Sequence, residues 1–527
     1  MVALCASTYT NPPVDPNLKN LAEELDTQLW GLLPGFHRLA FENGHVLLTL
    51  CTGNLAELLR QQLFEADTVE WNSSATAQTD WIYRAKAIAR LCKPGTLLTA
   101  SSSLLNKAFI EASLTQCGFV IEENGELVKA RYSAAWLTKK TRGTVVPGTC
   151  VVVGAGLAGA AVANSLARRG WTVTVLDAAS TPASGASSLP AGLLVPHTSP
   201  DDASLSRLSR AGVRVTLQQT RALLSHGTDW AHTGVLQRQL NNDSPHPSPA
   251  RPRRDTAQPE AASDWCYPAS DQTLVAAGLP PDSLALWHAQ AGWVKPAALV
   301  NAWLSATGIT WRGGVKVSHL TPNGEGWQAC NASGDVVAQA DMVVISAGYA
   351  SQLLASAAGA AAPDLQAIRG QVTFGLQIEG ETLPPFAVNG HGGLITAITT
   401  PEGPMWLMGA GYERDVDEPQ IKAHDHADNL RRLQTLLPQA ANALADQFSP
   451  QQARGWAGIR CATTNRLPRV GRLSAPDAGA GLWLCTGMGS RGLSFAALCG
   501  ELLAAQLHGE PLPIDSQLAK AMAVQKV

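Results

Sequence analysis

Three glycines and one acid in the middle of the chain have the residue types and the spacing of a dinucleotide-binding turn. They are Gly154, Gly156, Gly159 and Asp177, and the acid follows the first glycine by 23 residues. In such a turn the first glycine allows a tight bend, the second lets a pyrophosphate approach the backbone, and the third lets the helix pack closely. The carboxylate can accept hydrogen bonds from a ribose diol. The pattern predicts nucleotide binding, against the alternative of a glycine-rich turn in an ordinary α/β domain.

The elements that must position these residues can be read on both sides of the turn. Residues 151–153 are all valine and predict a buried strand. Residues 157–169 are rich in alanine and leucine and predict a helix that Gly170 ends, and residues 171–176 predict a second strand. The N-terminus of that helix offers free N–H groups to a phosphate.

Small-residue segments elsewhere decide between FAD and NAD. Near the C-terminus a hydrophobic strand, a glycine turn and a helix start recur, which predicts a second helix N-terminus aimed at a flavin, whereas NAD enzymes need only one such turn. Residues 313–317 predict a strand whose backbone faces the adenine. We therefore expect non-covalent FAD, held by Gly154, Gly156, Gly159, Asp177, Gly185, Ala186, Ser187, Gly192, Val317, Gly348, Gly487, Gly489, Ser490, Arg491 and Gly492.

Composition limits the remaining possibilities. The chain has 527 residues, is 45% hydrophobic and carries a net charge of −3, so it is not a basic nucleic-acid binder as a whole. It has no apolar run long enough for a transmembrane helix and no basic, apolar leader, so we expect no membrane association and a cytoplasmic location. The ten cysteines contain no CxxC pair, which argues against a zinc site or a disulfide framework, and we expect no metal. The oligomeric state is left open.

The chain divides into two predicted regions. Residues 1–145 precede the glycine turn and form one unit. Residues 149–515 form the flavin-binding unit, with substrate-domain segments at about 205–290 and 365–450. Within them, residues 241–264 are rich in Pro, Ser, Asn, Asp and Arg and predict a flexible surface insert.

The larger region resembles the D-amino-acid-oxidase-like family of flavin enzymes, which includes glycine and sarcosine oxidases. Within that family it is similar to the C-terminal oxidase half of the bifunctional enzymes that modify the wobble uridine of tRNA. The resemblance rests on residues 291–299, 368–372, 455–461, 467–471, 487–503 and 508–513. It implies an α/β fold, namely an FAD-binding two-dinucleotide-binding-fold domain with a mixed-sheet substrate domain, preceded by a partial Rossmann-like methyltransferase domain.

The resemblance also implies a reaction. The flavin half of the family oxidises the carboxymethylaminomethyl arm of a wobble (2-thio)uridine in the tRNA anticodon loop, and the imine that forms hydrolyses to an aminomethyl uridine and glyoxylate. Arg460 matches the position where related oxidases hold a substrate carboxylate, and a planar guanidinium suits that task. Arg491 is expected beside the flavin or the substrate, and Tyr412 in the substrate pocket. No residue stands out as the base that assists amine deprotonation.

In the same family the N-terminal region is a methyltransferase that uses S-adenosylmethionine. Residues 33–39, 44–58 and 89–97 resemble the second half of that domain. No glycine-rich cofactor loop precedes Leu33, and residues 67–76 lack the catalytic Asp-Gly-Phe segment of the family. We therefore predict a degenerate or truncated methyltransferase-like domain over residues 1–145, in which binding of S-adenosylmethionine is not expected.

Two other functions stay open at this point. The chain is also consistent with a small-molecule amine or amino-acid oxidase of the glycine or sarcosine type. A non-catalytic, tRNA-binding flavoprotein is the third reading.

Overall fold

The computed structural model describes residues 2–5, 18–72, 81–101, 107–124, 127–134, 145–240, 260–324, 326–380, 382–474 and 481–524. The insert expected over 241–264 lies outside the described residues up to 259, and its last residues form helix α7 (Glu260–Ser263). In the described part of the chain, no helix is long and apolar enough to cross a membrane.

A six-stranded sheet forms the centre of the larger region. Its strand order is β16-β9-β8-β20-β28-β27, and all neighbours are parallel except β27 with β28. The strands are β8 (Thr149–Val153), β9 (Thr172–Leu176), β16 (Ile309–Arg312), β20 (Met342–Ile345), β27 (Arg469–Arg472) and β28 (Leu482–Thr486). Chain order reverses between β8 and β20, and at such a point the carboxyl ends of parallel strands leave a crevice for a ligand.

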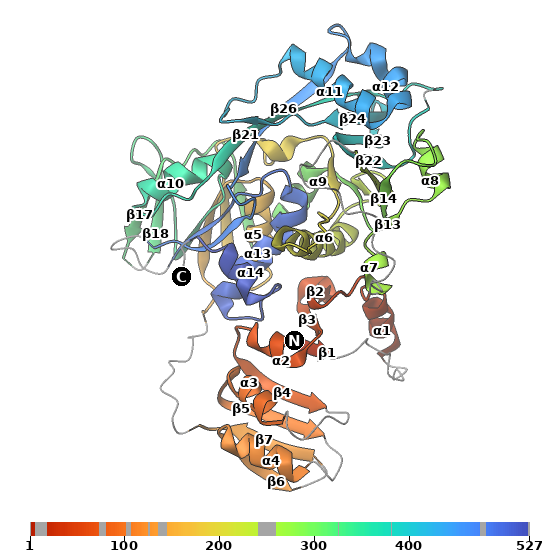
Figure 1. Cartoon of the computed structure of the whole chain (residues 1–527). Helices are drawn as coiled ribbons and strands as arrows, with labels where there is room; N and C mark the ends of the chain where they lie inside the picture. The colour runs from red at the N-terminus through yellow and green to blue at the C-terminus, as the bar shows by residue number, and fades with distance from the viewer. Residues whose placement is uncertain are drawn as a thin grey trace.

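Helices cover one face of this sheet and a small antiparallel sheet covers the other (Figure 1). The first face carries α5 (Leu157–Ala167), α13 (Gly492–His508), α6 (Ser204–Leu223), α9 (Pro296–Leu304) and α14 (Ser516–Ala521). The second carries α10 (Ser351–Ala357), β17 (His319–Asn323), β18 (Gly326–Cys330) and β19 (Val336–Ala340). Helix α6 falls in the segment assigned to the substrate domain, yet it packs on α13, where a Cβ on Gly212 would lie 1.6 Å from the Ser494 carbonyl oxygen.

The second large sheet has nine strands in the order β13-β14-β12-β22-β23-β24-β21-β25, with β26 also paired to β21. It is mixed, because β12 and β22 are parallel whereas the other pairs are antiparallel. Helices α8 (Asp271–Ala276), α11 (Ala423–Leu436) and α12 (Pro438–Leu444) pack on it. The strands are β12 (Val235–Arg238), β13 (Tyr267–Pro268), β14 (Ala285–His288), β21 (Gln366–Leu376), β22 (Ala387–Gly390), β23 (Gly392–Thr400), β24 (Gly403–Gly409), β25 (Glu413–Arg414) and β26 (Arg454–Ala462).

A three-stranded sheet lies between the two large ones, with β15 (Gly292–Val294) pairing β10 (Gly192–Leu194) and β11 (Trp230–Ala231). Its residues share a hydrophobic cluster with strands of the nine-stranded sheet. Strand β21 and strand β26 pair over nine residues and reach from the nine-stranded sheet back toward the six-stranded one (Figure 1).

The N-terminal region forms two further sheets (Figure 1). The first, in the order β1-β3-β2, has strands β1 (Val2–Cys5), β2 (Gly35–Phe41) and β3 (Val46–Thr52), with α1 (Lys19–Asp26) and α2 (Leu55–Arg60) nearby. The second, in the order β4-β5-β7-β6, has strands β4 (Ala66–Asn72), β5 (Cys92–Ser101), β6 (Phe119–Asn124) and β7 (Leu127–Tyr132), packed on α3 (Trp81–Ala89) and α4 (Lys107–Gln116).

The first of these sheets docks directly onto the larger region. Arg214 of α6 donates to the carbonyls of Gln28 and Trp30, and its guanidinium lies 4.3 Å from the centre of the Trp30 ring. Arg38 of β2 is buried and donates to the Pro511 carbonyl. The N-terminal region is therefore held by buried polar contacts as well as by apolar packing.

Candidate functional site

The predicted glycine turn follows β8 and leads into α5. Gly154 has a φ of 109°, a conformation that residues with a Cβ rarely adopt. A Cβ on Gly159 would lie 1.8 Å from the Gly154 carbonyl oxygen, so no larger residue fits without moving the turn. Gly156 caps α5 without a side chain, and a Cβ there would meet only the Ser187 hydroxyl at 3.2 Å. The backbone at the start of α5 is thus open to a ligand.

The acid at the end of β9 supports this turn. Asp177 accepts one hydrogen bond from the Ala155 N–H at 2.7 Å and another from the Ala179 N–H at 2.9 Å. Each carboxylate oxygen has a second lone pair, so the group can also accept a hydrogen bond from a ligand. Ser187 accepts a hydrogen bond from the Leu157 N–H at 3.0 Å, which ties the loop after β9 to the start of α5.

A single cavity of about 1520 Å³ runs from the glycine turn to the inner face of β26. It exceeds the roughly 300–1,000 Å³ that is usual for one small ligand, so it has room for a cofactor and a substrate together. Except for Gly159, which faces the Gly154 carbonyl, all the predicted site residues line it. They are Gly154, Gly156, Asp177, Gly185, Ala186, Ser187, Gly192, Val317, Gly348, Tyr412, Arg460, Gly487, Gly489, Ser490, Arg491 and Gly492.

One of these residues reaches the cavity in a different way from that predicted. The strand expected over 313–317 is wrong, because β16 ends at Arg312. The chain beyond it is held by N–H groups of Gly314 and Val315, which donate to the carbonyls of Ala179 and Asp177. Glycine pairs favour turns over strands, and this one carries the backbone around the end of β9 toward the cavity.

Arg460 lies at the far end of the cavity on β26. Its guanidinium packs over Gly370 of the neighbouring strand, where a Cβ would lie 2.2 Å from Nη2. Its only hydrogen bond among the described residues runs from Nη1 to the Gly411 carbonyl at 3.0 Å. Burial above all lowers the pKa of Arg460, which the nearby Arg432 reinforces and Tyr412 opposes. A partly buried cation with no carboxylate partner in the described chain is suited to receive an anion.

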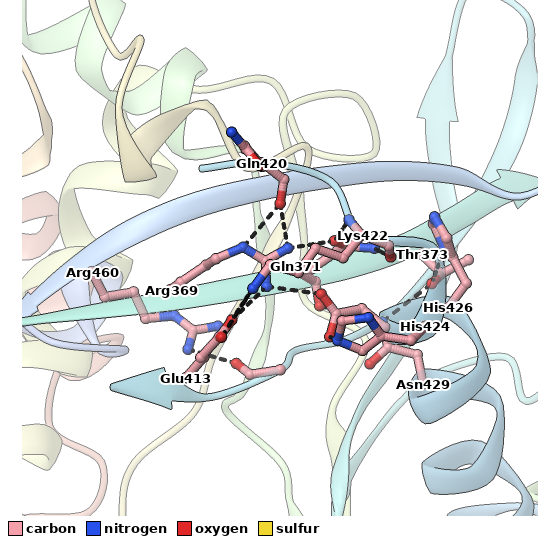
Figure 2. A network of polar contacts seen from close by, with 12 residues as sticks. Arg369, Gln371, Thr373, Glu413, Gln420, Lys422, His424, His426, Asn429 and Arg460 are labelled. Carbon is pink, nitrogen blue, oxygen red and sulfur yellow. Dashed lines mark hydrogen bonds and ion pairs between the residues drawn. The ribbon is translucent and has the colours of Figure 1, made fainter. Parts of the chain in front are cut away.

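Arg369, one strand away, has its charge fully compensated (Figure 2). Its guanidinium contacts Glu413 at 3.1 Å and Asp425 at 2.8 Å, and it also donates to the side chain of Gln371 and the Gln420 carbonyl. Figure 2 shows the two arginines arising from neighbouring strands and pointing to different surroundings. Arg369 therefore holds the loop after β25 in place, whereas Arg460 faces the cavity.

Arg491 precedes α13 and lines the cavity near the second glycine turn. Burial lowers its pKa, and the neighbouring Arg466 lowers it further. Nearby, burial together with Arg491 and Arg466 lowers the pKa of His197 to about 4, so its ring is neutral at pH 7. Ring atom Nδ1 of His197 lies 2.9 Å from the Ser206 hydroxyl, a contact that fixes the ring on α6.

Two features of the cavity were missed in the sequence. The Ser346 hydroxyl is buried, lines the cavity beside the glycine turn and has no partner in the described chain. Trp456 also lines the cavity, and its Nε1 donates to the Ser188 hydroxyl at 2.8 Å. Only the spacing could have revealed Trp456, since it precedes Arg460 by four residues on one strand and so shares its face.

The residues of this site fit a flavin dinucleotide. The open turn and α5 N-terminus suit a pyrophosphate, Asp177 suits a ribose, and the unpartnered Ser346 hydroxyl awaits a polar group. In the described part of the chain, no group of three or more His, Cys, Asp or Glu side chains is arranged to hold a metal ion.

Comparisons with known proteins agree with this geometry. Residues 149–506 match the family model described as FAD dependent oxidoreductase. The chain is 48% identical over 537 residues to the tRNA 5-methylaminomethyl-2-thiouridine biosynthesis bifunctional protein MnmC of Polaromonas naphthalenivorans, covering 98% of this chain and 82% of that protein. It is 44% identical to the MnmC protein of Delftia acidovorans, covering 98% and 83%.

Solved structures show the same fold in the larger region. Glycine oxidase from Geobacillus kaustophilus superposes with a TM-score of 0.54 at 18% identity, over 73% of this chain and 100% of that one. Fructosamine oxidase (Amadoriase II) from Aspergillus fumigatus superposes with a TM-score of 0.56 at 16% identity, over 72% and 91%. The predicted D-amino-acid-oxidase-like α/β fold is thus confirmed.

Proposed function

Because the chain belongs to the FAD dependent oxidoreductase family and, within it, to the family of MnmC proteins, we propose that it oxidises the carboxymethylaminomethyl arm of a tRNA wobble (2-thio)uridine. The products are an aminomethyl (2-thio)uridine and glyoxylate. In this reaction the methylene between the amine and the carboxylate loses a hydride to the oxidant. The resulting C=N bond takes up water, and the carboxyl-bearing fragment leaves as the aldehyde.

The unpaired guanidinium of Arg460 is the observation that carries this proposal. The arm ends in a carboxylate, and Arg460 is partly buried in the cavity wall with no ion pair to a carboxylate of the described chain. A bound carboxylate would supply the missing charge and fix the adjoining methylene at one place in the cavity.

We assign FAD to the glycine turns. Gly154, Gly156 and the start of α5 would hold the pyrophosphate, Asp177 the ribose, and the loops at Gly185–Ser187, Gly348 and Gly487–Gly492 the remainder, without a covalent bond. When bound there, FAD supplies the hydride acceptor.

Arg491 has a second role in this proposal. Hydride loss requires a neutral amine, and a nearby positive charge disfavours an ammonium ion. Once the substrate carboxylate neutralises Arg460, Arg491 remains as a cation in the cavity lining next to the second glycine turn. It keeps the amine deprotonated without a dedicated base. Tyr412, which is exposed and lines the cavity, contacts the substrate at the cavity mouth.

For the N-terminal region we propose a supporting role without methyl transfer. Its described residues form two separate sheets, and the three-stranded one is fixed to α6 by Arg214 and to the segment after α13 by Arg38. Incubation with S-adenosylmethionine should therefore leave the aminomethyl product unmethylated. A methylaminomethyl product would contradict this part of the proposal.

The central experiment compares Arg460→Ala with the unchanged protein on tRNA that carries the arm, with nucleoside analysis of the product. Removing one partner of a buried charge pair costs about 2–5 kcal/mol, so kcat/KM should fall roughly 30- to 5,000-fold while FAD content is retained. Arg460→Lys keeps the charge but not the bidentate geometry and should fall between the two. Arg431→Gln, an exposed residue paired with Asp428, is the matched control.

The same assay separates the alternatives. Turnover of glycine or N-methylglycine but not of tRNA would replace the proposal with a small-molecule amine oxidase. A purified protein without flavin absorbance would favour a non-catalytic RNA-binding protein.

A further inference from the structure

The inner face of β26 carries an aromatic ring beside Arg460. Trp456 and Arg460 are four residues apart on this strand, so both side chains lie on the cavity face, and Gly458 lies between them on the same face. The indole is anchored at its N–H, which donates to Ser188 in the loop expected to contact the flavin. It is thus fixed at one edge and partly exposed to the cavity.

Two glycines lie beneath the two side chains. Gly458 of β26 lies directly opposite Gly370 of β21. A Cβ on Gly458 would lie 2.4 Å from Cη2 of the Trp456 indole, and a Cβ on Gly370 would lie 2.5 Å from Cζ of Arg460. The indole therefore covers one glycine and the guanidinium covers its cross-strand partner. Residues paired in this way have Cα atoms about 4.5–5.5 Å apart, so the indole and the guanidinium are neighbours on the cavity wall.

We propose that Trp456 is the residue that recognises the base of the substrate, by stacking on the uracil ring while Arg460 holds the carboxylate. The inference rests on the proposed function. It assigns a residue to the uracil ring, which the contact between Arg460 and the carboxylate does not recognise. A methylene, an amine and a second methylene join the uracil to the carboxylate. A ring at Trp456 and a carboxylate at Arg460 would hold the two ends of that arm on neighbouring side chains of the cavity wall.

This arrangement predicts selectivity between two classes of amine. Glycine and N-methylglycine have the carboxylate but no ring, so they engage Arg460 alone. Stacking of a base on an aromatic side chain contributes about 1–3 kcal/mol. The protein should therefore favour carboxylates with a planar ring at the far end of the arm by roughly 5- to 150-fold over those with a methyl group there.

The test uses thioether analogues, in which sulfur replaces the amine so that no oxidation occurs. Dissociation constants of (benzylthio)acetate and (methylthio)acetate are measured by calorimetry on the FAD-loaded protein. The benzyl compound should bind more tightly by the factor above. Trp456→Ala should bring the two constants together, whereas Trp456→Phe, which keeps a ring, should retain most of the preference.

Two further variants separate recognition from a structural role. Gly458→Ala keeps the tryptophan but pushes its indole out of place, so it should also lose the preference. Ser188→Ala removes the acceptor of the indole N–H. The FAD content of this variant measures how much the hydrogen bond between Trp456 and Ser188 contributes to flavin binding. Equal affinity for the two thioethers in the unchanged protein, or an undiminished preference in Trp456→Ala, would overturn the inference.

The outcomes also distinguish this inference from the proposed function. A protein that prefers the benzyl compound but does not oxidise the tRNA arm contradicts only the proposed function. A protein that oxidises the arm but shows no ring preference contradicts only the role of Trp456.

Discussion

Two sets of arginines in this molecule have opposite surroundings: the pair beside Glu501 and the single arginine Arg460 in the cavity. Where the N-terminal region meets the helices of the larger region, Glu501 of α13 contacts Arg168 at 2.5 Å and Arg169 at 3.1 Å, and Arg169 also contacts Glu510 at 2.7 Å. In the cavity, Arg460 donates only to a backbone carbonyl in the described chain.

This difference in ion pairing separates arginines that stabilise the fold from an arginine that is available to bind a ligand. A desolvated ion without a countercharge costs several kcal/mol unless hydrogen bonds compensate it, as three backbone carbonyls do for Arg214. Uncompensated charges in a cavity are accordingly candidates for function, whereas compensated ones at a contact are structural until shown otherwise. The two regions should then respond in opposite ways when the charge is removed.

The largest expected loss of stability follows from substitution of Glu501. Glu501→Gln preserves shape but leaves Arg168 and Arg169 buried without their shared carboxylate, so the free energy of unfolding should fall by about 3–5 kcal/mol. Activity per folded molecule should not change, because Glu501 lies outside the cavity lining. Urea unfolding and flavin-normalised turnover measure the two quantities. Glu510→Gln is the control, and its effect should be smaller because that side chain is 29% exposed.

The pH dependence of stability tests whether the charge of Glu501 causes the loss expected in Glu501→Gln. Burial alone raises the pKa of Glu501, but Arg169 and Arg168 outweigh it and hold that pKa well below its usual range. A carboxylate with a lowered folded-state pKa adds stability that is fully present above its unfolded pKa, about 4.3, and is lost as pH falls toward the folded value. The stability difference between the parent and Glu501→Gln should therefore be constant from about pH 7 to 5 and shrink below about pH 4. A difference that grows on acidification would rule out this explanation.

Removing the charge of Arg460 should have the opposite effects, namely a gain in stability and a loss of activity. Arg460→Met removes a desolvated cation and leaves an apolar side chain over Gly370, so the ligand-free protein should become more stable by about 0.5–2 kcal/mol while losing substrate oxidation. Thermal unfolding without substrate measures the first effect. A large loss of stability would mean that Arg460 belongs with the structural arginines.

Much of this organisation was predictable, for a physical reason. The first glycine turn and its acid are local in sequence, and the restriction on the backbone is strong, as the positive φ of Gly154 and the 1.8 Å approach at Gly159 show. The second turn, at Gly487–Gly492, was predicted from the same kind of local pattern, whereas the role of Arg460 was predicted through resemblance to a family. Local patterns of small residues therefore predicted the cavity walls.

Other features depend on tertiary packing that no local pattern encodes. Nothing in the sequence pairs Gly370 with Gly458, which lie on strands far apart in the chain and make room for Arg460 and Trp456 respectively. The docking of Arg38 and Arg214 depends on carbonyls of distant segments in the same way. The strand expected over 313–317 does not form, because the glycine pair at 313–314 favours a turn despite the β-branched valines that follow.

The smallest expected effect is on an exposed ion pair. It tests whether an ion pair must be buried to contribute several kcal/mol to the free energy of unfolding. Arg131 and Glu122 form an ion pair at 2.6 Å on the four-stranded sheet, but their side chains are 47% and 37% exposed. Water screens exposed pairs, so Arg131→Gln should change the free energy of unfolding by at most about 1 kcal/mol. That change should vanish in about 1 M salt, where the Debye length is only about 3 Å, whereas the Glu501 effect should persist. If both effects were equally sensitive to salt, the contact at Glu501 would be open to solvent, and its contrast with the cavity would not hold.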